Sequence, residues 1–271
     1  MINTPFNYTG SKFKLLEKIL PFFDYDKKYF IDVFTGGGSV YTNVAEEYEK
    51  ILANDIITDL IKIHEKLVNN PDEIIKDTLK YCVSKEDSDG FLKLRQSYNK
   101  DKSPEKLWAL MLCCTNNMMR FNKKLEFNQT FGKRTFNTNT KKKINEFVEY
   151  ISKYKHKIYF CNKNFYELEI KKPSMVYFDP PYMETEAGYN AYWSRDLDSK
   201  LYDFVIDCSK KNSIAISGLY GEHKNGKRSK LIDDLLSYGF KYEIINYNYE
   251  KVARNKNSKN SKEILIYKVS I

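Results

Sequence analysis

Short apolar runs alternate with segments of helical spacing along most of this 271-residue chain. The runs are rich in aromatic and β-branched residues and too short for buried helices, so we predict that they form buried strands. The first five runs are Tyr29–Phe34, Ile51–Ala53, Lys157–Cys161, Met175–Phe178 and Asn212–Ser217. Strands that alternate with helices predict an α/β fold whose sheet is largely parallel.

The end of the chain predicts a change of strand direction. Leu231–Tyr238 has helical spacing, and Gly239 is a typical helix stop. Tyr242–Val252 and Glu263–Val269 are then predicted to form a hairpin, joined by a basic loop at residues 253–262 that either lies near a polyanion or keeps the edge soluble. A hairpin added to parallel strands predicts a mixed sheet, which we expect to have seven strands.

The segment between Gly36 and Asp179 is too long for an uninterrupted sheet. Consecutive βα units reach a fourth strand after roughly 60–90 residues, and the surplus here has the pattern of helices. Three helices are predicted at Pro71–Val83, Glu86–Tyr98 and Pro104–Cys114. We therefore predict a discontinuous catalytic domain, residues 1–66 and 155–271, with an inserted helical module at residues 67–154 for target recognition or dimerisation.

The strand Met175–Phe178 runs into the tetrapeptide Asp179–Tyr182, whose sequence is Asp-Pro-Pro-Tyr. The two prolines stiffen the turn because proline fixes φ and has no N–H, and open α/β sheets bind ligands at the carboxyl ends of their strands. A planar amino group can donate one hydrogen bond to the Asp179 carboxylate and another to the Pro180 carbonyl, while Tyr182 stacks on the attached ring. The arrangement suits adenine N6 or cytosine N4, although the four residues alone also fit a surface turn.

A glycine-rich turn, Thr35–Val40, follows the strand Tyr29–Phe34 and precedes a helical pattern at Tyr41–Tyr48. Glycines between a strand and a helix let the backbone approach a nucleotide-like ligand closely. The third glycine of a dinucleotide fingerprint is missing, because Tyr41 stands in its place. Asp55, after the second strand, is placed to accept hydrogen bonds from ribose hydroxyls. The pattern predicts a nucleoside cofactor bound without a pyrophosphate.

A third motif, Asn7–Lys12, precedes a helical pattern at Phe13–Leu20. Asn7–Lys12, Phe34–Ser39 and Asp179–Tyr182, in this order, resemble the motifs of the Dam-type (class α, D12) DNA adenine-N6 methyltransferases over nearly the whole chain. The resemblance implies a Rossmann-like S-adenosylmethionine-dependent methyltransferase fold. It implies the catalytic residues Asp179, Pro180 and Tyr182. It also implies that the cofactor contacts Tyr8, Lys12, Phe34, Gly36, Gly38, Asp55 and Asp179.

Amides, cations and aromatic residues alternate in the segment Thr115–Lys143. Arginine and asparagine make bidentate contacts to guanine and adenine edges in the major groove, whereas lysines suit phosphates. A solvated polar loop is the alternative. By resemblance to the family, Arg120 reads a guanine and the Asn116–Met119 region fills the gap left by a flipped base. We expect DNA contacts from Asn116, Arg120, Asn122, Asn128, Lys133 and Arg134.

The composition agrees with a polyanionic partner. Lysine and arginine (45 residues) exceed aspartate and glutamate (36 residues), which gives a formal net charge of +9. The five cysteines have neither C-x-x-C spacing nor flanking histidines, so we expect no metal site and no disulfide framework. No apolar run approaches the ~18 residues of a membrane helix and no signal peptide precedes the first motif. We therefore expect no membrane partner and a location in the cytoplasm of a bacterial or phage-infected cell.

These features predict a site-specific methyltransferase that uses S-adenosylmethionine, flips an adenine out of double-stranded DNA and methylates its N6. Its partner is a cognate endonuclease if it belongs to a restriction–modification system, and a solitary or phage methylase is the other possibility. Three alternatives stay open: a cytosine-N4 enzyme, an RNA adenine methyltransferase and a noncatalytic DNA-binding protein. Asp179 favours adenine, because the cytosine-N4 tetrapeptide commonly begins with serine, and the arginine- and asparagine-rich segment favours duplex DNA over RNA. Binding of S-adenosylmethionine distinguishes an enzyme from a noncatalytic protein.

Overall fold

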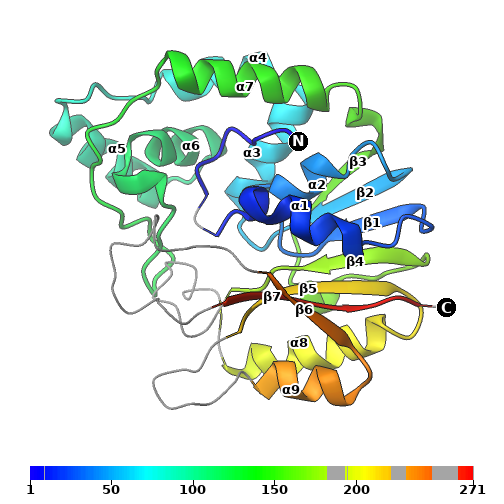
Figure 1. The fold of residues 1–271 in the computed structure, drawn as a ribbon. Helices are drawn as coiled ribbons and strands as arrows, with labels where there is room; N and C mark the ends of the chain where they lie inside the picture. Colours follow the sequence, from blue (N-terminus) through cyan, green and yellow to red (C-terminus); the bar gives the residue numbers. More distant parts are fainter. Residues whose placement is uncertain (9, 182–192, 194, 221–229, 246–261, 271) are drawn as a thin grey trace.

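The computed structural model describes residues 1–8, 10–181, 193, 195–220, 230–245 and 262–270. It contains a seven-stranded sheet in the order β3-β2-β1-β4-β5-β7-β6 (Figure 1). The strands are β1 (Tyr29–Asp32), β2 (Lys50–Asn54), β3 (Ile158–Cys161), β4 (Ser174–Phe178), β5 (Ser213–Tyr220), β6 (Lys241–Ile245) and β7 (Lys262–Lys268). The first five are parallel, and β7 runs antiparallel between β5 and β6. The predicted mixed, Rossmann-like sheet is confirmed.

Helices cover both faces of the sheet, because its side chains alternate between two cores. Met175 and Tyr177 of β4 belong to one core cluster, and Val176 and Phe178 to the other. The helices are α1 (Leu16–Ile19), α2 (Ser39–Asn43), α3 (Thr58–Asn69), α4 (Pro71–Leu79), α5 (Ser88–Lys100), α6 (Pro104–Cys113), α7 (Thr138–Ile151), α8 (Arg195–Cys208) and α9 (Lys230–Ser237). Figure 1 shows α8 and α9 on the opposite face from α1 and α2. None of the described helices is long and apolar enough to span a bilayer.

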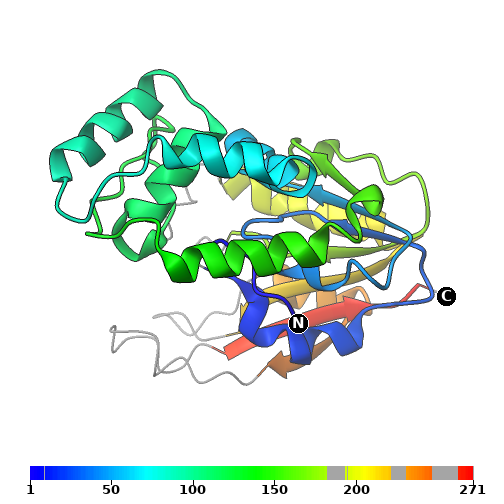
Figure 2. The same cartoon turned by 90° about the horizontal axis from the view of Figure 1, so that it is seen from above.

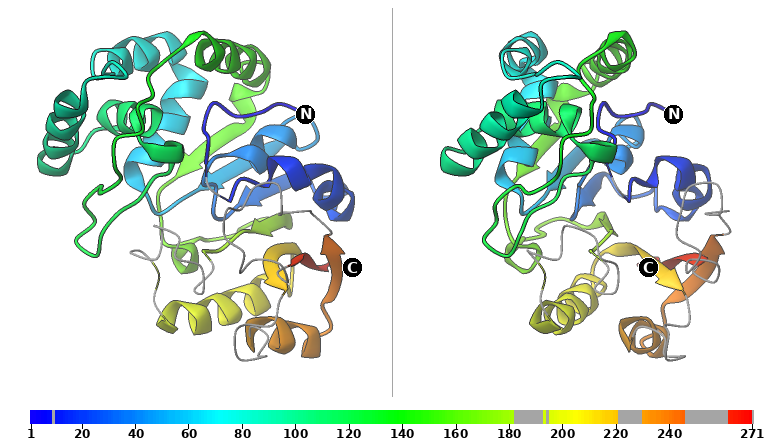
Figure 3. Two further views of the ribbon diagram at one scale, coloured as in Figure 1. Left: turned by 60° about the vertical axis from the view of Figure 1, so that its left-hand side comes forward. Right: turned by 90° about the vertical axis from the view of Figure 1, so that its left-hand side faces the viewer.

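The helices α4–α7 stand together to one side of the sheet (Figures 2 and 3). Three of them, α4, α5 and α6, correspond to the three helices predicted between the glycine-rich turn and Asp179. The group contacts the sheet through α3. Phe91, Trp108 and Phe147 from these helices are buried in the same cluster as Phe30 of β1. The helical segment therefore shares one continuous core with the sheet.

Two N-terminal helices differ from the sequence prediction. The helix expected at Phe13–Leu20 is divided into a 3₁₀ turn (Lys12–Leu15), α1 and a second 3₁₀ turn (Leu20–Phe22). Pro21 lies in the second turn, where it has no N–H to continue the α-helical ladder. The helix expected at Tyr41–Tyr48 begins earlier and ends at Asn43, because Val44 leaves the helical backbone conformation (φ −106°, ψ 4°).

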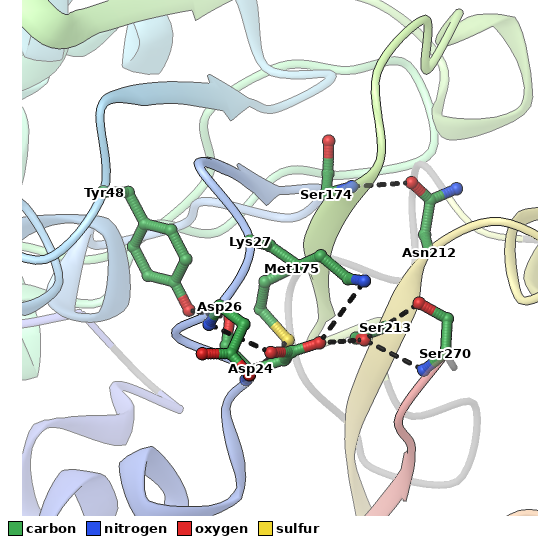
Figure 4. A network of polar contacts seen from close by, with 9 residues as sticks. All are labelled: Asp24, Asp26, Lys27, Tyr48, Ser174, Met175, Asn212, Ser213 and Ser270. Atoms are coloured by element: carbon green, nitrogen blue, oxygen red, sulfur yellow. Dashed lines mark hydrogen bonds and ion pairs between the residues drawn. The ribbon is translucent and has the colours of Figure 1, made fainter.

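A polar network closes the end of the sheet where the parallel strands begin (Figure 4). Asp24, before β1, accepts a hydrogen bond from Ser213 at the start of β5, and its N–H approaches the Met175 sulfur of β4 at 3.4 Å. Asn212 accepts a hydrogen bond from the Ser174 N–H at 2.9 Å. The order of the strands reverses between β1 and β4, so the ligand crevice is expected at the opposite end, where these two strands finish.

Candidate active site

The glycine-rich turn after β1 has a backbone conformation that favours glycine. Gly36 has a φ of 48° and Gly38 a φ of 75°, both in the left-handed region. Tyr8 packs over this turn, and a β-carbon built on Gly37 would lie 2.5 Å from the Tyr8 β-carbon. The missing side chain of Gly37 therefore allows the close approach that brings Tyr8, Gly36 and Gly38 together, three of the residues predicted to bind a cofactor.

Asp55 holds the same turn from the end of β2. Its Oδ2 accepts a hydrogen bond from the Gly36 N–H at 2.9 Å, and its Oδ1 accepts one from the Ile57 N–H at 2.9 Å. Burial raises the pKa of Asp55, and these backbone N–H groups oppose the rise. A carboxylate oxygen has more than one acceptor site, so Asp55 can fix the turn and still accept a hydrogen bond from a ligand hydroxyl.

His64 on α3 contacts the glycine-rich turn through the Gly36 carbonyl. The sequence did not predict this residue as part of the site. Its Nε2 lies 2.8 Å from the Gly36 carbonyl, and its Nδ1 lies 3.1 Å from the Tyr41 hydroxyl. Because a carbonyl only accepts, Nε2 carries the proton and Nδ1 accepts from Tyr41. Burial lowers the pKa of His64 to about 4. In the sequence, His64 is only one polar position in an amphipathic helix, so nothing local marks it.

His64 predicts a pH dependence of stability. Its pKa is about 6.5 in the unfolded chain and about 4 when folded, so the unfolded state binds more protons as the pH falls. The contribution is fully present above pH 6.5 and is lost toward pH 4. Between pH 7.5 and pH 5 we expect a loss of about 2 kcal/mol. Denaturant titrations of wild type and His64→Gln measure it, because glutamine can still donate to Gly36 but does not titrate. Equal slopes in both proteins would contradict the assignment.

Asp32, the last residue of β1, has a buried carboxyl group. Neither carboxylate oxygen has a hydrogen-bond partner of standard geometry among the described residues. Burial first, and then the charge of Asp179, hold the pKa of Asp32 well above its usual range. Buried polar groups are normally paired, so a ligand that donates hydrogen bonds or carries positive charge fits this position. The sequence prediction did not include Asp32.

Phe34 stands in an aromatic group beside the turn. Its ring centroid lies 5.6 Å from that of Phe165, 5.7 Å from that of Trp193 and 6.5 Å from that of Phe178. These edge-on and tilted contacts are the usual favourable geometry for aromatic pairs. The predicted cofactor residue Phe34 therefore forms part of an apolar wall next to the glycine-rich turn.

Asp179 lies directly after β4, next to β1 in the sheet. Its Oδ1 is 2.8 Å from Lys12 Nζ, with the Lys12 side chain 5% and the Asp179 side chain 19% exposed. The structure thus brings together the N-terminal motif and the tetrapeptide, because the Lys12 ammonium forms an ion pair with the Asp179 carboxylate. Pro180 is buried. Tyr182 lies outside the described residues, so its role stays a prediction.

The segment predicted to contact DNA folds partly as a two-stranded ribbon. Antiparallel bridges join Cys114 to Phe131 and Phe121 to Phe127, and the Asn128 N–H donates to the Arg120 carbonyl at 3.0 Å. The sequence predicts a segment of alternating amides, cations and aromatic residues here, but no paired strands. A two-stranded ribbon has the width that the major groove of DNA admits.

The candidate DNA-contacting side chains differ in their exposure and in the hydrogen bonds that they already make within the protein. Arg120 is exposed, whereas Asn122 is occupied within the ribbon: its Nδ2 donates to Glu126 at 2.8 Å and its Oδ1 accepts from the N–H groups of Lys124 and Glu126. Asn128 is half-buried, and its Oδ1 has no hydrogen-bond partner among the described residues. Asn122 therefore shapes the turn of the ribbon, and Arg120 and Asn128 lie opposite each other on its two strands.

The remaining candidates border the ribbon. Lys133 is exposed and has a φ of 50°, and Asn116 is exposed with a φ of 58°. Such values are uncommon outside glycine and are a strained geometry for lysine in particular. Arg134 donates to Asn117 Oδ1 at 2.6 Å, and Asn7 donates to the same oxygen at 3.3 Å. Asn117 therefore links the N-terminal motif to the ribbon segment.

Comparison with known proteins places this arrangement in a family. Residues 8–251 match the family model of the D12 class N6 adenine-specific DNA methyltransferases. The chain belongs to this D12 family. It is similar to the modification methylase StsI of Streptococcus sanguinis (31% identity over 98% of this chain and 42% of that protein) and to the type II methyltransferase M.FokI of Planomicrobium okeanokoites (32%, 98% and 42%). It is also similar to the DNA adenine methylase of Haemophilus influenzae (25%, 77% and 76%). The chain spans about two-fifths of the first two relatives.

S-adenosylmethionine is the cofactor of this D12-class fold, and the geometry fits it. The glycine-rich turn and Tyr8 form a close cradle, Asp55 offers acceptor sites for ribose hydroxyls, and Phe34 offers an apolar surface for a ring. Asp32 supplies a buried carboxyl group whose oxygens have no hydrogen-bond partner of standard geometry within the described residues, and this group suits the positively charged amino acid part. No group of three His, Cys, Asp or Glu side chains suited to a metal ion occurs in the described part of the chain.

Proposed function

We propose that this chain transfers a methyl group from S-adenosylmethionine to adenine N6 in duplex DNA. The supporting observation is the Asp179 carboxylate at the carboxyl end of β4, beside the glycine-rich turn of β1, in a chain of the D12 family. A base inside a duplex cannot reach this crevice, so adenine enters after flipping out of the stack. Cytosine N4 has a similar amino group, and the family membership favours adenine.

Two acceptors orient the target amino group. The Asp179 carboxylate and the Pro180 carbonyl each accept a hydrogen bond from N6, whose lone pair is otherwise delocalised into the ring. This pairing favours a pyramidal nitrogen with its lone pair directed at the methyl group. Asp179 is 19% exposed, so it can also pass the proton that N6 loses to solvent. Tyr182 is proposed to stack on the base.

The cofactor side of the crevice is assigned to the N-terminal half. Bound S-adenosylmethionine supplies an electrophilic methyl group on a sulfonium. We assign its ribose hydroxyls to Asp55 and its adenine to the aromatic wall at Phe34. Tyr8, Gly36 and Gly38 shape the cradle, and Lys12 lies where it can contact Asp179 and a cofactor carboxylate. No residue of the chain becomes covalently attached to the substrate.

Residues 67–154 are proposed to act as a target-recognition module inserted in the catalytic domain (residues 1–66 and 155–271). The ribbon of Arg120 and Asn128 is proposed to enter the major groove. We assign Lys133 to the phosphate backbone. The Asn116–Met119 region is proposed to fill the space that the flipped base leaves.

The cellular role follows from the relatives named as modification methylases. Such an enzyme protects DNA against a cognate restriction endonuclease, which we propose as the partner in the cytoplasm of a bacterial or phage-infected cell. Sequencing DNA from cells that express the chain, with a readout of modified adenines, gives the site. Methylation of a single short sequence supports the role, and scattered modification contradicts it.

A direct assay tests the proposed reaction. The purified chain is incubated with methyl-labelled S-adenosylmethionine and a duplex DNA of mixed sequence, and the digested nucleosides are analysed by mass spectrometry. We expect label in N6-methyladenine and none in N4-methylcytosine. Single-stranded RNA of the same sequence serves as the second substrate. Label confined to cytosine or to RNA would overturn the proposal in favour of the corresponding alternative.

We predict that the substitution Asp55→Ala lowers the affinity for S-adenosylmethionine. The substitution removes an acceptor for the ribose and also releases the Gly36 N–H. We expect S-adenosylmethionine binding to weaken by about 1–2 kcal/mol. Calorimetry measures the affinity, and Asp59→Asn, a buried acid on α3 bonded to Tyr98 (3.0 Å), serves as the control. Unchanged affinity in Asp55→Ala would mean that its carboxylate only supports the turn and caps the chain before α3.

A further inference from the structure

Glu263 is a buried acid in an otherwise apolar strand. It stands in β7, opposite Leu219 of β5 and Ile245 of β6, and its side chain is 2% exposed. The next three residues, 264–266, are buried apolar side chains. A carboxylate in such surroundings is costly unless it is paired, so its partner identifies what it does.

One partner is Lys12, whose ammonium also contacts Asp179. Lys12 Nζ lies 3.5 Å from Glu263 Oε1 and 2.8 Å from Asp179 Oδ1, and it donates to the Gly10 carbonyl at 3.2 Å. The ammonium therefore bridges two carboxylates from strands that are not neighbours in the sheet, since β5 separates β4 from β7. Lysine side chains are long and flexible, so these contacts set where the charge lies.

We propose that Glu263 is a positioning residue for methyl transfer, which holds Lys12 between its own carboxylate and that of Asp179. The inference rests on the proposed function of the Asp179 crevice. Glu263 shares the Lys12 charge, so Asp179 is fixed in place without being fully neutralised. Asp179 thus keeps its strength as an acceptor for the N6 hydrogen. Without the charge of Glu263, the buried Lys12 ammonium is drawn more strongly to Asp179 and competes with the substrate for it.

A double-variant cycle on the full chain tests this role. Glu263→Gln keeps the shape of the side chain and removes its charge, and we expect kcat to fall by about 10- to 100-fold, the range known for residues that orient metal ligands through hydrogen bonds. Because the change acts mainly on the reacting group, kcat is expected to fall by a larger factor than KM for S-adenosylmethionine rises. Glu263→Asp, which keeps the charge, recovers part of the rate. The control Asp59→Asn retains wild-type kcat.

The cycle is completed by Lys12→Met. Since Glu263 acts through Lys12, the double variant Lys12→Met/Glu263→Gln is expected to be no slower than Lys12→Met alone. Losses that multiply would overturn the inference, and so would a Glu263→Gln protein as active as the Asp59→Asn control. If Glu263→Gln does not fold, Glu263→Asp takes its place in the cycle with the same criterion. A wild-type chain that methylates no adenine overturns the proposed function and this role together, whereas an active wild type separates the two.

Discussion

Asp179→Ala is expected to lose methyl transfer almost completely while keeping its fold and its cofactor. In the proposed reaction the carboxylate accepts a hydrogen bond from N6 and orients the nitrogen lone pair, so its loss is expected to remove an interaction that is strongest in the transition state. We expect kcat to fall by at least about 100- to 1000-fold. Rapid-quench measurement of label transfer to duplex DNA determines the rate. Calorimetry with S-adenosylmethionine shows whether the crevice is intact.

Asp179→Asn is the matched variant, because it keeps the shape and one carbonyl oxygen but has no charge. If the acceptor geometry alone matters, Asp179→Asn retains much more activity than Asp179→Ala. If the charge beside Lys12 matters, both lose activity to a similar extent. Near wild-type turnover in Asp179→Ala would sink the assignment. A variant that also loses cofactor binding would show that Asp179 mainly anchors Lys12.

The parts of the site that the sequence predicted are those made by consecutive residues. The glycine-rich turn is recognisable because Gly36 and Gly38 adopt left-handed backbone, and Asp179 because two prolines follow its strand. Asp55 follows the second strand, and the structure places it on the Gly36 N–H. In each case a strand end and a short motif determine the position, so local spacing was sufficient.

The parts that the sequence did not predict depend on contacts between distant residues. Glu263 meets Lys12 only because β7 is inserted antiparallel between β5 and β6, and no local pattern specifies that insertion. His64 reaches Gly36 from the helix after the second strand. The ribbon was missed because single bridges such as Phe121–Phe127 form no continuous strand pattern, and Asn122 supplies the turn bonds.

Arg120→Ala is expected to weaken binding to the cognate duplex by about 1–3 kcal/mol and to relax discrimination at one base pair. Arg120 is exposed on the ribbon, whose width suits the major groove. Guanine presents two acceptors there, which a guanidinium contacts in a bidentate manner. Because a mismatched base pair lacks these acceptors, wild type discriminates against it, and the variant no longer does.

Lys133→Ala is the matched comparison. Lys133 is exposed beside the ribbon and is assigned to a phosphate. Its removal is expected to weaken all duplexes alike and to reduce the slope of log affinity against log salt by about one unit. A panel of single-mismatch duplexes, each titrated at two salt concentrations, separates the two behaviours, since base edges carry sequence information and phosphates do not. If Arg120→Ala weakens every duplex equally and flattens the salt dependence, Arg120 contacts phosphate and the guanine assignment is wrong.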